Sequence, residues 1–287
     1  MVNRTQFRRL FEPGQIGQMQ LKNRIVMPPM GTGYAEEFVG KAVKDKRSQV
    51  VIATKFASPM GEGPNERGGS RYYIMKAVES SLRRLQTDYI DLYQMHRPDP
   101  TTPIEETLRA LDDLVRAGKV RYIGCSNFAA WQLCEALWTS KIDNLVSFVT
   151  VQPQYNLLNR QVEQELAPCC QAYGIGIIPY SPLASGFLTG KYHRGEEVPA
   201  GTRLATAPAM QSRVLTGDNF DRLAQLEAFA TVRGHSVGEL AIAWLLSHPW
   251  LSTVIAGATR TEQVSANVTA AEWKLTAQEM AELDQSA

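Results

Sequence analysis

Residues 89–128 read YIDLYQMHRPDPTTPIEETLRALDDLVRAGKVRYIGCSNF, two apolar runs on either side of a helical pattern. The runs YIDLYQM and VRYIGCS are nearly continuous, as in strands of a parallel sheet that is covered on both faces. Between them, Pro103 suits a first helical turn, and Gly118 stands where the helical pattern stops. The stretch therefore predicts a strand–helix–strand unit of an α/β protein.

The same alternation runs along the chain, and successive apolar runs mostly begin about 26–40 residues apart, the size of a βα unit. The candidate strands are Ile25–Met27, Val50–Thr54, Tyr89–Met95, Val120–Ser126, Val146–Gln152, Ile175–Tyr180 and Thr253–Ala256. The candidate helices are Glu36–Lys46, Tyr72–Leu85, Ile104–Ala117, Trp131–Trp138, Gln161–Tyr173, Asn219–Arg233 and Val237–Ser247. Two Gly- and Pro-rich stretches, 59–70 and 192–218, are predicted loops.

This spacing favours one closed TIM barrel, (β/α)8, over residues 1–287 as a single domain. An open doubly wound sheet is the alternative, but no G-x-G-x-x-G motif follows a first strand. The seven candidate strands are one fewer than a barrel needs. We therefore expect a barrel that is one βα unit short or has an atypical first strand.

The composition excludes several classes of protein. The content of 44% hydrophobic and 21% charged residues is typical of a globular protein. The net charge of +1 leaves no excess of positive charge that would attract nucleic acid or an anionic membrane. It has no apolar run of membrane-spanning length, and its first residues lack the apolar core of a signal peptide. The four cysteines lack metal-binding spacing, which predicts a cytoplasmic protein without a bound metal.

Polar residues stand where the candidate strands end, at positions where a core would prefer valine or leucine. They include Lys55, His96, Gln152 and the pairs Ser126-Asn127 and Tyr180-Ser181. In a barrel these ends meet at one face, where active sites are built. A single lysine at a strand end most often extends into solvent, so it is the whole set that predicts a site.

From about residue 36 to the end, the chain resembles the aldo-keto reductase family, in the branch related to potassium-channel β subunits. The matching stretches are EEFVGKAVKDKRSQVVIATKF, the quoted 89–128 segment, VQPQYNLLNR, YGIGIIPYSPLASGFLTGKY and TVIAGATRTEQVSANV. The resemblance implies a TIM-barrel oxidoreductase that reduces a small aldehyde or ketone with NADP(H); NAD(H) stays an alternative. That family uses a catalytic Asp, Tyr, Lys and His.

The resemblance also assigns roles to individual residues. Lys55 and His96 match the catalytic lysine and histidine. The cofactor-binding positions, which would hold the nicotinamide, the pyrophosphate and the adenosine 2′-phosphate, are Ser126, Asn127, Gln152, Tyr180, Ser181, Leu183, Gly186, Lys191, Gly257, Thr259, Arg260, Gln263 and Asn267.

The beginning of the chain departs from this pattern. Residues 9–35, RLFEPGQIGQMQLKNRIVMPPMGTGYA, resemble the hairpin and first barrel strand of old yellow enzyme and 2,4-dienoyl-CoA reductase flavoproteins. We interpret the chain as a fusion, or chimera, joined near residues 33–36. FMN is not expected, because nearly all flavin-binding residues of such an enzyme would lie in the part of the barrel that is absent.

The departure leaves the proton donor in question. Tyr34 is the candidate acid, but Pro29 stands where the family aspartate would be, and Glu36 or Glu37 is the substitute carboxylate to consider. Three functions follow: an active carbonyl reductase, a nicotinamide-nucleotide-binding protein with impaired catalysis, and, least favoured, a flavin-dependent reductase. Because an unclosed barrel exposes sheet edges, we also expect a homo-oligomer or a gapped barrel.

Overall fold

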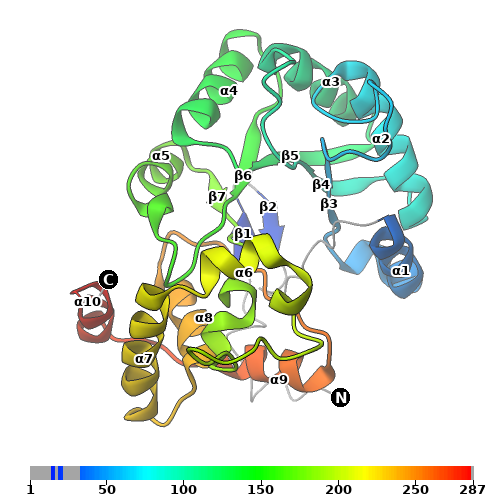
Figure 1. The fold of residues 1–287 in the computed structure, drawn as a ribbon. Helices are drawn as coiled ribbons and strands as arrows, with labels where there is room; N and C mark the ends of the chain where they lie inside the picture. Colours follow the sequence, from blue (N-terminus) through cyan, green and yellow to red (C-terminus); the bar gives the residue numbers. More distant parts are fainter. Residues whose placement is uncertain (1–13, 17–18, 22–32, 286–287) are drawn as a thin grey trace.

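The computed structural model describes the whole chain except residues 1–13, 17–18, 22–32 and 286–287 (Figure 1). Its centre is a parallel sheet of five strands whose spatial order follows the sequence. The strands are β3 (Ala53–Phe56), β4 (Ile90–Met95), β5 (Val120–Ser126), β6 (Phe148–Gln152) and β7 (Gly176–Ile177). The prediction of an α/β protein with a parallel sheet is confirmed.

The start of β3 lies three residues later than predicted, because a side-chain carboxylate accepts a hydrogen bond from the backbone just before it. The Asp91 carboxylate accepts a hydrogen bond from the backbone N–H of Ile52 at 2.9 Å. Asp91 also accepts from Arg47 at 2.8 Å and from Arg121 at 3.1 Å, and both guanidinium groups stack on the Tyr89 ring. This cluster anchors the entry of β3 to β4 and β5.

The prediction of a regular strand at Thr253–Ala256 is wrong. This segment follows β7 in parallel through a bridge between Ile177 and Leu251 and through N–H bonds from Ser252 to Ile177 and from Ile255 to Pro179, both 3.1 Å. β7 itself is shorter than predicted, since Pro179 has no N–H to continue the ladder.

Helices follow the strands and lie outside the sheet, as Figure 1 shows for α2 to α5. In the first half they are α1 (Gly33–Val43), the 3-10 helix η2 (Lys44–Gln49), α2 (Arg71–Leu85), α3 (Ile104–Arg116), α4 (Ala130–Ile142), η3 (Gln161–Glu163) and α5 (Leu166–Tyr173). In the second half they are η4 (Ala184–Thr189), η5 (Leu204–Thr206), α6 (Pro208–Val214), α7 (Gly217–Thr231), α8 (Val237–Ser247), α9 (Thr261–Ala270) and α10 (Ala277–Gln285). The prediction of a single loop over 192–218 is wrong, because η5 and α6 lie within it.

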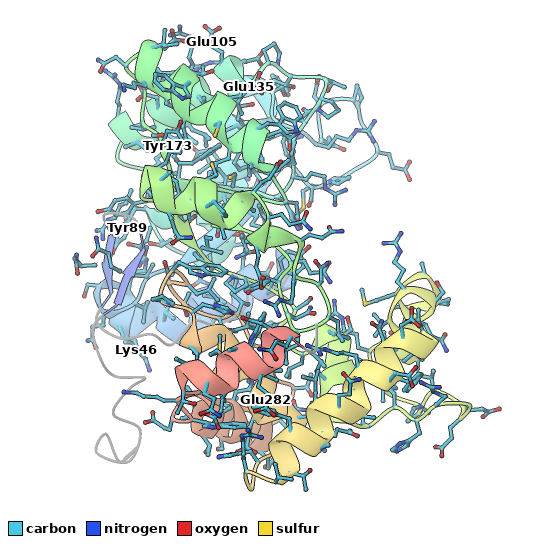
Figure 2. The ribbon with its side chains drawn as sticks, turned by 90° about the vertical axis from the view of Figure 1, so that its left-hand side faces the viewer. Lys46, Tyr89, Glu105, Glu135, Tyr173 and Glu282 are labelled. Atoms are coloured by element: carbon cyan, nitrogen blue, oxygen red, sulfur yellow. The ribbon has the colours of Figure 1, made fainter. Side chains whose placement is uncertain are left out.

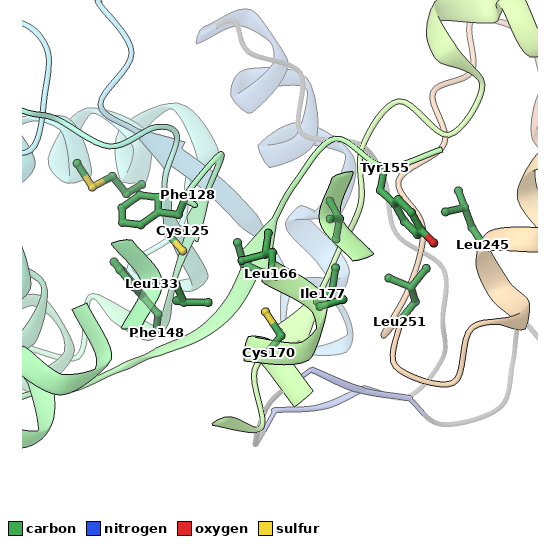
Figure 3. Close-up of a cluster of buried hydrophobic side chains, with 14 of the residues drawn as sticks. Cys125, Phe128, Leu133, Phe148, Tyr155, Leu166, Cys170, Ile177, Leu245 and Leu251 are labelled. Carbon is green, nitrogen blue, oxygen red and sulfur yellow. The ribbon is translucent and has the colours of Figure 1, made fainter. Parts of the chain in front are cut away.

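Two apolar clusters show that the sheet is curved. The larger one lies between the sheet and its helices and contains Leu133, Phe148 and Cys170 (Figure 3). The smaller one joins Leu92, Ile178 and Ile255. Since β4 and β7 are three strand spacings apart, about 14 Å in a flat sheet, the sheet must bend to bring Leu92 and Ile178 into one cluster. Its concave face is therefore the inside of a barrel-like arc.

The beginning of the chain forms a short antiparallel hairpin, β1 (Gly14–Ile16) with β2 (Met19–Leu21), and β1 lies against β7. The predicted first strand, Ile25–Met27, lies outside the described residues. Among the strands that the structure describes, only β4 pairs with β3. The single domain, the eighth strand and the homo-oligomer therefore stay predictions. No helix in the described ranges is long and apolar enough to cross a membrane.

Candidate active site

A cavity of about 1350 Å³ opens where the strands end at their carboxyl side. It is lined by both predicted catalytic residues whose side chains are described, Lys55 and His96, and by all predicted cofactor-binding residues. The structure thus brings together residues that are up to about 210 positions apart in the sequence. Their individual roles stay predictions.

Lys55 is the third residue of β3 and alternates with the buried Thr54 and Phe56. Burial away from water lowers the pKa of its ammonium group to about 8. No carboxylate within the described part of the chain forms an ion pair with it. Between the start of the chain and residue 35 the sequence has one acidic residue, Glu12, and it lies outside the described residues. Lys55 therefore carries a weakly held proton beside the cavity.

His96 follows β4 directly, and its backbone N–H donates to Phe56 at 3.0 Å. Its Nδ1 atom is 2.5 Å from the Ser58 hydroxyl, a partner that the sequence did not reveal. Burial, followed by the charges of Lys55 and Arg97, lowers the pKa of His96. The imidazole is therefore neutral at pH 7, and when Ser58 donates to Nδ1, the ring N–H lies on Nε2.

A hydrogen-bonded chain of side chains forms one wall. Ser126 donates to the Gln152 carbonyl at 2.7 Å, and Asn127 donates to the His96 carbonyl at 2.9 Å. The Tyr180 hydroxyl donates to Asn127 Oδ1 at 2.8 Å, and burial raises the pKa of Tyr180, so this hydroxyl stays protonated. The Gln152 side-chain amide has no hydrogen bond among the described residues and is available to a ligand.

The segment after β7 has an unusual backbone with a cation beside it. Ser181, Ala184, Ser185 and Gly186 all have positive φ, between 46° and 90°. At Gly186 the φ of 90° favours glycine, and the Lys191 Nζ atom lies 2.7 Å from where a Cβ would be. The N–H groups of Ala184 and Gly186 already donate to the carbonyls of Ser181 and Leu183, so the Lys191 ammonium is the positive group that this segment offers to an anion.

The last part of the cavity wall is the start of α9. Arg260 is its N-cap residue and is exposed. The Gln263 side chain accepts from the Thr259 backbone N–H at 2.7 Å and from the Thr259 hydroxyl at 3.1 Å, which orders the turn. A helix N-terminus with a neighbouring arginine favours the binding of a phosphate group.

The predicted acid Tyr34 is the second residue of α1, but its side chain lies outside the described part of the structure. Glu36, considered as a substitute for the family aspartate, is engaged elsewhere. Its two oxygens accept from the Thr54 hydroxyl and from Arg84 Nε, both at 2.6 Å. Glu37 is exposed. The described residues also contain no group of three or more side chains arranged to hold a metal.

A family model described as "Aldo/keto reductase family" matches residues 30–287, most of the chain. The chain belongs to the aldo/keto reductase family. Family membership implies the (β/α)8 barrel, of which the curved parallel sheet is the described part.

Individual aldo/keto reductase relatives match over most of the chain. A probable voltage-gated potassium channel subunit beta from Oryza sativa subsp. japonica is 42% identical over 83% of this chain and 74% of its own length. L-glyceraldehyde 3-phosphate reductase from Escherichia coli strain K12 is 35% identical over 97% of this chain and 81% of its own. Versiconal hemiacetal acetate reductase from Aspergillus parasiticus is 36% identical over 88% of this chain and 79% of its own.

These matches bear on the interpretation of the chain as a fusion. The family model begins at residue 30, and the E. coli reductase aligns with nearly the whole chain, including most of the segment that we compared with flavoproteins. Neither match supports a flavoprotein-like beginning or a chimera.

Proposed function

We propose that this protein reduces small aldehydes or ketones with a reduced nicotinamide cofactor, and that it prefers NADP(H) to NAD(H). The observation that carries the proposal is the single cavity into which Lys55, His96 and every predicted cofactor-binding residue converge. The reductase names of two relatives are consistent with a carbonyl substrate. A cytoplasmic location stays a prediction.

The residues present fit a nicotinamide dinucleotide. The Tyr180 ring and the Gln152 side-chain amide both line the cavity, and together they suit a flat ring that bears a carboxamide. The positive-φ segment with Lys191 suits the pyrophosphate, and Arg260 at the start of α9 suits a 2′-phosphate. When bound, such a cofactor would supply the hydride.

The chain's own residues would stabilise and protonate the oxygen of the substrate. In the cavity, the Lys55 ammonium would stabilise negative charge that develops on the carbonyl oxygen, and this effect is large where water is excluded. The neutral His96 would donate a hydrogen bond from Nε2 and orient the carbonyl. The Tyr34 hydroxyl is the proposed proton donor, and the Lys55 ammonium would ease the loss of its proton if the two groups meet in the cavity.

The test of Tyr34 is the variant Tyr34→Phe, measured by cofactor oxidation with a panel of aldehydes and ketones. We expect kcat to fall by about 10²–10⁴-fold, the usual contribution of a general acid, and the affinity for NADPH to be unchanged. Tyr72→Phe is the matched control, since Tyr72 is an exposed tyrosine of α2. Equal activity of the Tyr34→Phe variant and the unsubstituted protein would exclude Tyr34 as the acid.

A nicotinamide-nucleotide-binding protein with little turnover is the second candidate. It is favoured by Lys55 having no carboxylate partner in the described structure and by Pro29 at the aspartate position. Saturable quenching of NADPH fluorescence, with no turnover of any carbonyl in the panel, would favour it over the reductase. No binding of either dinucleotide would exclude both functions.

The preference for NADP(H) predicts the behaviour of Arg260→Gln. Loss of the guanidinium is expected to raise the Kd for NADPH by about 10–100-fold, since a hydrogen bond to a charged group contributes about 1.5–3 kcal/mol. The Kd for NADH should not change, because NADH lacks the 2′-phosphate. Arg213→Gln, an exposed position on α6, is the control for general charge effects. Equal loss for both cofactors would contradict the assignment.

A further inference from the structure

Two thiols face each other on the outer layer of the barrel, away from the cavity. Cys134 lies on α4 and Cys169 on α5, and their Sγ atoms are 3.2 Å apart. Both residues are only partly buried, whereas Cys125 and Cys170 have no exposed surface. The proposed reaction makes no use of these two sulfur atoms.

The contact belongs to a regular packing of the two helices. One turn further along each helix, Trp138 Nε1 donates to the Tyr173 hydroxyl at 3.1 Å. Both contacts join residues 35 positions apart, so α4 and α5 run parallel in constant register. Figure 2 faces this side of the molecule and labels Glu135 on α4 and Tyr173 on α5. The register holds the two sulfur atoms together without any constraint from the active site.

We propose that Cys134 and Cys169 are a modification site, a dithiol that a two-electron oxidant such as hydrogen peroxide converts into a disulfide linking α4 to α5. Two S–H bonds and the O–O bond of the peroxide break, one S–S bond forms, and two water molecules leave. The sulfur atoms lose two electrons and the peroxide gains them. The sulfur atoms must approach by only about 1 Å to reach the S–S bond length of about 2.05 Å.

The surroundings predict a slow and selective reaction. Burial and the hydrogen bond with Cys134 raise the pKa of Cys169 to about 12, and burial raises the pKa of Cys170 to about 12. Because the thiolate is the reactive form, the rate should increase as the pH rises above 7. The full burial of Cys125 and Cys170 keeps the oxidant from them, so the partly buried pair Cys134 and Cys169 reacts first.

The disulfide would join two neighbouring βα units. α4 follows the strand that ends in Ser126, and α5 follows the strand that ends in Gln152. Because the link closes a long loop of the unfolded chain, we expect the melting temperature of the oxidised protein to rise by about 5 °C or more.

The experiment uses the full chain, reduced first and then treated with hydrogen peroxide at pH 7 and pH 9. We expect the mass to fall by about 2 Da and two of the four thiols to disappear from a titration under denaturing conditions. Proteolytic mapping should find the peptide with Cys134 joined to the peptide with Cys169. Cys134→Ser and Cys169→Ser should each prevent the link, and Cys170→Ala should retain it.

Proteolytic mapping of the unsubstituted chain tests for the Cys134–Cys169 disulfide even if a variant fails to fold. Four free thiols after treatment, a link between Cys169 and Cys170, a link between two chains, or addition of oxygen without a cross-link would each overturn the proposal. None of these readouts depends on a dinucleotide or a carbonyl compound. Their outcome is therefore separate from that of the proposed reductase activity.

Discussion

Replacing Lys55 with methionine is expected to lower kcat/KM for carbonyl reduction by about 10²–10³-fold, the usual effect of removing one preorganised group that stabilises an oxyanion. The same variant is expected to be more stable than the parent. Burial of the ammonium lowers its pKa to about 8, so the folded state holds this charge at a cost. Methionine fills a similar volume without a charge.

The stability effect has a defined pH window. Below pH 8 the lysine is protonated in both the folded and the unfolded state, so the cost is fully present. Between pH 8 and about 10.4 only the unfolded state retains the proton, and the stability of the parent therefore rises with pH. Allowing for partial solvent screening, we expect Lys55→Met to gain about 2 kcal/mol in the free energy of unfolding at pH 7 and almost nothing near pH 10.5.

Urea unfolding at pH 7 and pH 10, combined with steady-state kinetics, measures both effects. Lys76→Met is the control, because Lys76 lines the same cavity but its side chain is 55% exposed and paired with Glu66 at 3.2 Å. Its stability should change by no more than about 0.5 kcal/mol. A Lys55→Met variant that is less stable than the parent at pH 7 but fully active would refute two claims: that Lys55 acts in catalysis, and that burial of its charge destabilises the folded state.

The largest loss of stability is expected for Asp91→Asn. Asp91 is 4% exposed and holds Arg47, Arg121 and the backbone N–H of Ile52 at the start of β3. Asparagine keeps the shape but removes the charge. The Arg47 guanidinium, whose side chain is 15% exposed, then has only neutral acceptors, the Thr87 hydroxyl and the carbonyls of Val50 and Tyr89. Breaking a buried ion pair from one side costs about 3–5 kcal/mol, which is a large part of a typical folding free energy.

Denaturant unfolding of Asp91→Asn and of Asp88→Asn provides the comparison, since Asp88 is an exposed residue two positions before β4. Asp88→Asn should change the free energy of unfolding by less than about 0.5 kcal/mol. Amide exchange should accelerate first in β3, because Asp91 anchors the entry of this strand. If both variants lost equal stability, the Asp91 cluster would have no special role.

Local signals explain which elements the sequence could predict. α8 has the predicted bounds, Val237–Ser247, because Ser236 and Glu239 form a capping box at its start. β5 also has the predicted bounds, and α3 begins where Pro103 indicated. The start of β3 was missed because Asp91, 39 residues away, captures the Ile52 N–H. No local pattern contains such a contact.

The amino-acid sequence alone determined the alternation of strands and helices and the polar residues at the strand ends, because periodicity, caps and turn residues act over a few neighbours. Only the tertiary structure decided that Glu36 accepts hydrogen bonds from Thr54 and Arg84. The same holds for the hydrogen bond between Ser58 and His96 and for the contact between Cys134 and Cys169. These contacts arise where separate βα units pack against each other. The distances between their side chains follow from the curvature of the sheet and the register of its helices, which belong to the folded chain as a whole.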